Sequence, residues 1–198
     1  MATRIAEYVT QKLLESSVIE EGDRELFVYG FFLLVMRSFF LFITVFAGLM
    51  VSIPGESILF YMVFMFLRTY AGGVHARTEM TCTILTSLTL IISVFGIKFM
   101  EQMNNDIIPV LMFIGGCVSI LLFSPLDTKE KPLEEWEKKK YRTVCVAIVL
   151  FCIAVILIAY KLALNAILYP LACGVFFEGA LLVIGKICCI RNISTNKV

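Results

Sequence analysis

A histidine and a cysteine able to carry out nucleophilic chemistry lie close together in one segment of this 198-residue chain. The segment reads Arg68-Thr-Tyr-Ala-Gly-Gly-Val-His-Ala-Arg77, and Cys82 follows seven positions after His75, which is the only histidine. A thiol becomes a strong nucleophile when a nearby imidazole accepts its proton, and the same imidazole can then protonate a leaving amine. His75 and Cys82 are therefore the candidate catalytic pair.

The spacing of this pair restricts its geometry. Residues seven apart on a straight helix are about 10 Å apart along the axis, which is too far for a hydrogen bond. We therefore expect His75 to lie on a loop that precedes the helix of Cys82, and Gly72–Gly73 permits such a loop to fold back.

The helix that follows has a polar and an apolar face. A polar face in a membrane helix is expected to point toward a bundle interior or a cavity. The alternative is that its hydroxyl groups bond to their own backbone and help helices to pack. The polar face holds Thr78, Cys82, Thr86, Thr89 and Ser93, and the opposite face holds Ile84, Leu88, Ile91 and Ile92.

Composition places these residues in a membrane protein. Hydrophobic residues make up 60% of the chain and the mean hydropathy is +0.91, whereas a soluble domain is about 45–50% apolar. Six long apolar runs predict an all-α, polytopic membrane protein with six transmembrane helices. The second run spans only about 24 Å and is expected to end before the membrane surface. The runs are Leu26–Ile53, Ser57–Leu67, Met80–Ile97, Ile107–Phe123, Thr143–Tyr160 and Asn165–Gly185.

One integral membrane domain is predicted over residues 1–198. Residues 1–25 are interpreted as an interfacial amphipathic helix, because Ile5, Val9 and Leu13 recur at helical spacing between charges. The alternative is a frayed polar lead-in. Residues 26–185 form the six-span bundle, and residues 186–198 form a cytoplasmic tail.

Charge placement predicts the orientation. Alternate loops hold 14 of the 17 Lys and Arg residues, and the intervening loops hold 2. Because positive loops stay inside, both termini and the loops around 68–79 and 124–142 should be cytoplasmic. The net charge of +1 gives no indication of a nucleic-acid partner.

The seven cysteines do not indicate a metal site or disulfides. One histidine and no Cys-x-x-Cys pair make a zinc site improbable, and we predict neither metal nor cofactor. Most of the cysteines lie within apolar runs, where a cysteine is by default a small packing residue.

Two motifs carry a resemblance to a known family. The string Arg-x-x-Ala-Gly-Gly-x-His-Ala with a cysteine seven residues after the histidine resembles the active-site signature of the AgrB family. These are membrane peptidases that mature the autoinducing peptides of Gram-positive quorum sensing. A second stretch, Ser124-Pro-Leu-Asp-Thr-Lys-Glu-Lys-Pro132, resembles the family's Pro-x-Asp-Thr motif and its following lysines. The similarity in length and span order covers essentially the whole chain.

The resemblance implies a cysteine endopeptidase of the Gram-positive cell membrane that acts on an AgrD-type propeptide from the cytoplasmic side. Cys82 would be the nucleophile and His75 its base, with Arg68, Gly72 and Gly73 as a supporting segment. The enzyme would release an acidic C-terminal tail and leave a thioester, which a Cys or Ser of the substrate would capture as a thiolactone or lactone. A homodimer is compatible with so small a bundle.

The basic residues after the second motif have two interpretations. They either recognise the acidic tail of the substrate, or they set the topology and contact anionic membrane lipid. The lysines concerned are Lys129, Lys131, Lys138, Lys139 and Lys140.

Four other charged residues each have more than one interpretation. Glu79 or Asp127 could orient His75, or both are solvated loop carboxylates. Arg37 and Glu178 lie inside apolar runs, where a lone charge is costly, so we predict that they pair with each other. Two rival functions stay open: a small transporter or channel, and a non-catalytic membrane scaffold. Only the peptidase requires Cys82 to be unusually reactive.

Overall fold

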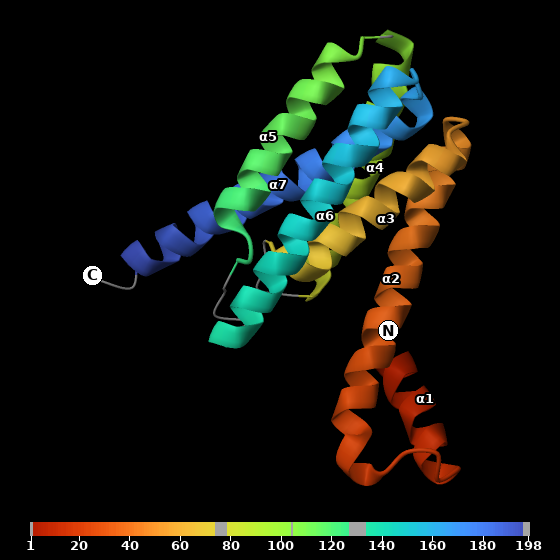
Figure 1. Cartoon of the computed structure of the whole chain (residues 1–198). Coiled ribbons are helices and arrows are strands. Elements are labelled where there is room, and N and C mark those ends of the chain that lie inside the picture. Colours follow the sequence, from red (N-terminus) through yellow and green to blue (C-terminus); the bar gives the residue numbers. More distant parts are fainter. Residues whose placement is uncertain (1, 74–78, 104, 127–133, 196–198) are drawn as a thin grey trace. The chain divides into compact units, whose positions relative to one another are not determined.

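The structure is a computed structural model that describes residues 2–73, 79–103, 105–126 and 134–195; for Glu79 and residues 189–195 it describes the backbone alone. All regular structure in these ranges is helical (Figure 1). The chain divides into a unit of residues 1–43 and a unit of residues 44–198. The helices are α1 (Ala2–Glu15), the 3-10 turn η1 (Glu21–Asp23), α2 (Arg24–Met50), α3 (Pro54–Ala71), α4 (Glu79–Met103), α5 (Ile107–Phe123), α6 (Glu135–Lys161) and α7 (Asn165–Thr195).

The first unit contains α1 and the first part of α2. The helix predicted near the N-terminus is confirmed for Ala2–Glu15, and its buried residues are Ala6 and Thr10. It ends at a turn in which the Val18 N–H donates to the Leu13 carbonyl at 3.0 Å. The position of this helix at a membrane surface stays a prediction, as does the single domain.

Four helical stretches in the described ranges are long and apolar enough to cross a membrane. The prediction of an all-helical membrane protein is confirmed to this extent. Six spans are not confirmed, because α5 is an apolar helix of only 17 residues and α3 is not among the four. The four stretches are Glu21–Met50, Met80–Met103, Glu135–Lys161 and Asn165–Cys188.

Two boundaries differ from the prediction. Helix α6 begins at Glu135, well before the apolar run at Thr143, because Glu134 and Glu137 form a reciprocal capping box at its start. The basic cluster at 138–140 therefore lies on the first turns of a helix and not in a loop. Helix α7 likewise continues to Thr195, so most of the predicted tail is helical.

Helix α7 is the centre of the second unit. It contacts α3, α4, α5 and α6 and crosses behind α5 and α6 in Figure 1. The approach to α5 is close: a Cβ atom added at Gly116 would lie 2.6 Å from the Val175 carbonyl oxygen, and one at Gly179 would lie 2.8 Å from the Gly116 Cα. Small residues at such crossings let membrane helices pack backbone to backbone.

Candidate functional site

The turn after α3 is built from two glycines and an arginine. Gly72 and Gly73 have φ values of 82° and 147°, which favour glycine. Arg68 Nη1 donates a hydrogen bond to the Gly72 carbonyl at 3.3 Å. A Cβ atom at Gly73 would lie 1.6 Å from the same nitrogen. Gly73 must therefore stay without a side chain while Arg68 lies across the turn.

Arg68 also ties this turn to α7. Its Nη1 lies 4.0 Å from Glu178 Oε2, and the Glu178 side chain is 0% exposed whereas that of Arg68 is 17% exposed. Neither carboxylate oxygen has a hydrogen-bond partner among the described residues. Removing one partner of a buried pair leaves an uncompensated charge, which costs about 3–5 kcal/mol. The ion pair therefore holds the end of α3 against α7.

This pair adds a contact that the sequence did not predict, because Glu178 was expected to pair with Arg37 and the structure places Arg68 beside it. Arg37 belongs to the first unit and Glu178 to the second. The pairing of Arg37 with Glu178 therefore stays a prediction.

The two motif segments meet in space. The Leu126 N–H donates to the Ala71 carbonyl at 2.9 Å. A Cβ atom at Gly72 would lie 3.2 Å from the Leu126 carbonyl oxygen, and the Leu126 side chain is buried. The Ser124–Leu126 segment thus packs directly on the glycine turn, although the two are far apart in the chain.

The first turns of α6 are attached to the same region. Arg142 donates to the carbonyls of Ser124 at 3.3 Å and Leu121 at 3.4 Å. These carbonyls belong to the C-terminal end of α5, where helical carbonyls lack partners within the helix. Tyr141 makes an edge-on contact with Tyr70 of α3, with ring centroids 5.8 Å apart. Together these contacts gather the ends of α3, α5 and α6.

Cys82 lies in the first turn of α4 and is half-buried. The predicted polar face is buried only at Ser93, while Thr86 and Thr89 are half-buried. On the opposite face Ile84, Leu88 and Ile92 are exposed. The packing alternative also holds for part of this face, because the Ser93 hydroxyl donates to the Thr89 carbonyl at 2.7 Å. The Thr89 hydroxyl donates in the same way to the Leu85 carbonyl.

The remaining described cysteines contrast with Cys82. Four of them are buried packing residues, as predicted, and one on α7 is exposed. Within the described ranges, no three His, Cys, Asp or Glu side chains gather as a set of metal ligands. The buried residues are Cys117, Cys145, Cys152 and Cys173, and the exposed one is Cys188.

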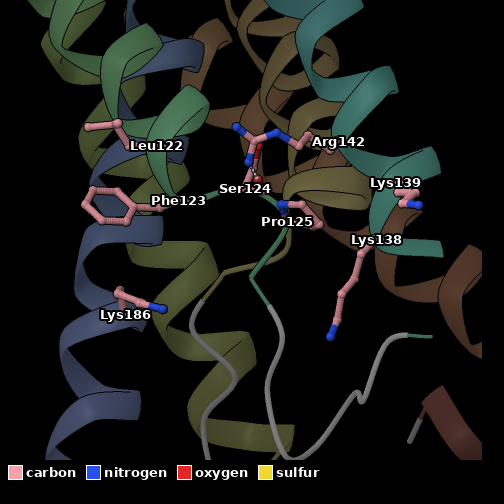
Figure 2. A pocket seen from close by; sticks show the side chains of 8 residues that line it. All are labelled: Leu122, Phe123, Ser124, Pro125, Lys138, Lys139, Arg142 and Lys186. Atoms are coloured by element: carbon pink, nitrogen blue, oxygen red, sulfur yellow. Dashed lines mark hydrogen bonds between the residues drawn. The ribbon is translucent and has the colours of Figure 1, made fainter. Parts of the chain in front are cut away.

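A basic pocket of about 450 Å³ opens where α5, α6 and α7 come together (Figure 2). Two of the five predicted lysines line it, Lys138 and Lys139. Lys140 is instead placed with its Nζ 5.8 Å from the centre of the Trp136 ring. The full lining is Leu122, Phe123, Ser124, Pro125, Lys138, Lys139, Arg142 and Lys186.

Sequence reasoning missed the part that Arg142 and Lys186 play in this pocket. Lys186 was assigned to the tail, because the apolar run ends at Gly185. A lysine directly after an apolar run is a signal that could have placed it at the membrane boundary.

Comparison with known proteins assigns the family. The family model described as Accessory gene regulator B matches residues 2–182. The chain belongs to this family. Membership supports a role of this AgrB-family chain in processing the autoinducer of an accessory gene regulator system, together with an AgrD-type propeptide partner.

Relatives of this AgrB-family chain come from several genera. It is 28% identical to an AgrB-like protein 2 of Clostridium perfringens, over 71% of this chain and 68% of the relative. It is 27% identical to an AgrB-like protein of Halalkalibacterium halodurans, over 92% of this chain and 87% of the relative. Accessory gene regulator protein B of Staphylococcus saprophyticus is 22% identical over 49% of this chain and 51% of its own. No solved structure matches.

Several predicted site residues of this AgrB-family chain lie outside the described ranges. His75 falls in residues 74–78, and Asp127, Lys129 and Lys131 fall in residues 127–133. The pairing of His75 with Cys82, and its orientation by Asp127 or by the Glu79 side chain, therefore stay predictions.

Proposed function

We propose that this chain is a membrane-embedded cysteine endopeptidase that removes the C-terminal tail of an AgrD-type propeptide through a thioester on Cys82. The observation that carries the proposal is the contact between the two family motifs, made by the Leu126–Ala71 hydrogen bond. A half-buried cysteine begins the helix that follows the first of these motifs. Family membership supplies the substrate class.

The proposed reaction has two steps. His75 accepts the proton of the Cys82 thiol, and the thiolate attacks the carbonyl carbon that precedes the acidic tail. The C–N bond then breaks, His75 returns the proton to the departing amine, and a thioester is left on Cys82. A Cys or Ser of the substrate attacks this thioester, which closes the ring and restores the Cys82 thiol. Keeping water out favours cyclisation over hydrolysis.

Two features of the described structure suit this chemistry. The N–H groups of the first turn of a helix lack partners within the helix, so the start of α4 offers donors for the oxyanion of a tetrahedral intermediate at Cys82. The Arg68–Glu178 pair fixes the Gly72–Gly73 turn, and only Val74 separates that turn from His75. We infer that Arg68, Gly72 and Gly73 position the base.

The test uses the full chain in vesicles with a propeptide substrate. Cys82→Ala and His75→Ala should each abolish tail release while expression and substrate binding persist, and the double variant should be no worse than either single one because the residues act as a unit. Mass spectrometry after an acid quench should find the N-terminal part of the substrate attached to Cys82.

Cys188→Ala is the matched control, because Cys188 is the other described cysteine that is not buried. It should release the tail at the normal rate. Normal release by Cys82→Ala would overturn the proposal and return the scaffold or transporter interpretation.

A further inference from the structure

The basic pocket lies at the end of an exposed apolar stripe on α5. Leu122 is 67% exposed and forms part of the pocket wall. Exposed side chains precede it at helical spacing along the whole helix, so they form one continuous face. The stripe consists of Ile107, Leu111, Ile114, Val118 and Leu122. In a membrane protein such a face contacts acyl chains, and the pocket then lies at the depth of the lipid headgroups.

The charges in the pocket come from two helices. Lys138 and Lys139 lie on α6, and Lys186 lies on α7, on the other side of the α5 end in Figure 2. No Asp or Glu is among the described residues that line the pocket. Lys138 also pairs with Glu135 at 3.1 Å, and the Arg142 guanidinium donates to backbone carbonyls. Lys139 and Lys186 are both exposed.

We propose that this pocket binds the phosphate headgroup of an anionic phospholipid, with an acyl chain lying along the α5 stripe. Basic pockets between membrane helices on the cytoplasmic side suit anionic headgroups. The apolar wall formed by Leu122 and Phe123 favours a lipid over a soluble anion, since a soluble anion gains nothing from the stripe. The inference does not depend on the peptidase reaction.

The lipid would also serve as a structural link. Its headgroup would lie between the lysines of α6 and Lys186 of α7 beside the end of α5, and the α5 end is the point from which the Ser124–Leu126 segment leads to the glycine turn. A ligand that binds only the folded state stabilises it by an amount that grows with the logarithm of the ligand concentration relative to its dissociation constant.

The test measures lipid retention by native mass spectrometry in a neutral detergent. The wild-type chain should retain phosphatidylglycerol in preference to phosphatidylcholine, and Lys139→Gln with Lys186→Gln should weaken phosphatidylglycerol binding by about tenfold. Lys140→Gln is the control for the Lys139 change, since Lys140 carries the same charge on the same helix but contacts Trp136 rather than the pocket. It should retain the lipid. Lys139→Arg with Lys186→Arg should retain it too, which separates charge from loss of fold.

Competition measurements then distinguish a lipid headgroup from a soluble anion or an acidic peptide. Glycerol phosphate without acyl chains should compete at least tenfold more weakly than phosphatidylglycerol. Equal competition, or displacement of the lipid by an equimolar acidic peptide, would overturn the lipid assignment in favour of a soluble anion or a peptide tail. The assignment of this pocket as the lipid site would be overturned if Lys140→Gln lost as much phosphatidylglycerol binding as the Lys139→Gln, Lys186→Gln variant. It would also be overturned if the wild-type chain showed no preference for phosphatidylglycerol.

Discussion

At the scale of single residues, Arg68 carries two contacts that together define the turn before the candidate base. Its guanidinium donates to the Gly72 carbonyl and lies 4.0 Å from the Glu178 carboxylate. The carboxylate is fully buried and depends on this cation, whereas the arginine is partly exposed to its surroundings. Removing Arg68 and removing the charge of Glu178 should therefore change the free energy of unfolding by different amounts.

A double-mutant cycle tests this pair. Arg68→Met should lower the free energy of unfolding by about 3–5 kcal/mol because it strands the Glu178 carboxylate. Glu178→Gln should cost less, and Arg68→Met with Glu178→Gln should recover part of the loss, with a coupling of about 1–3 kcal/mol. Denaturant unfolding in detergent provides the measurement. The exposed Lys98–Glu101 pair, with 2.8 Å between Nζ and Oε2, is the control and should show a coupling below about 1 kcal/mol. Additive losses at Arg68 and Glu178 would show that they are not partners.

The residues of the site were only partly predictable. The motif named Arg68, Gly72, Gly73 and Cys82, because its letters are local in the chain. The partner of Arg68 was not predictable, because hydropathy assigns Glu178 to a span without saying which helices face it. The same reason applies to Arg142, whose contacts with the α5 carbonyls depend on how α5 and α6 meet.

At the scale of elements, apolar runs mark the parts of helices that suit a membrane, not the helices themselves. The run at Ile107–Phe123 coincides with α5 because Asp106 and Ser124 flank it directly. The run at Thr143–Tyr160 underestimates α6, because its first turns are charged and are stabilised by a capping box and an Arg142 contact. Hydropathy cannot detect that kind of stabilisation.

The α5–α7 crossing yields an element-scale prediction. Gly179→Ala and Gly116→Ala should each destabilise the chain by about 1–3 kcal/mol, because the new methyl group meets backbone atoms that cannot rotate away. Gly115→Ala is the control: nothing lies within 4 Å of its added Cβ. It should be neutral or stabilising by up to about 1 kcal/mol, as alanine is the better helix former. Thermal unfolding of the three variants measures this, and a Gly179→Ala protein as stable as Gly115→Ala would contradict the close crossing.

At the scale of the whole molecule, the lengths of α3 and α5 bear on how many times the chain crosses the membrane. Helices α3 and α5 have 18 and 17 residues, so they span about 27 and 26 Å against a bilayer core of about 30 Å. Local thinning of the bilayer accommodates a mismatch of this size at modest cost. The positive charges of Arg68 and Arg77 also favour an inside position for the segment between α3 and α4.

Reporter fusions decide between six spans and four. If all six helices from α2 to α7 cross, fusions after Arg77 and Lys138 should report inside, and fusions after Ser52, Gln102 and Lys161 should report outside. If only the four long helices cross, the fusion after Arg77 should report outside and the fusion after Gln102 should report inside. The other three fusions should report the same side as in the six-span arrangement. Ser52 and Lys161 are therefore internal controls, and Arg77 and Gln102 carry the decision. We expect the six-span result, because the four-span arrangement would move Arg68 and Arg77 outside and Lys98 inside, against the 14-to-2 division of Lys and Arg between alternate loops. An outside signal after Arg77 would also put the start of α4, and Cys82 with it, on the wrong side of the membrane for a cytoplasmic propeptide.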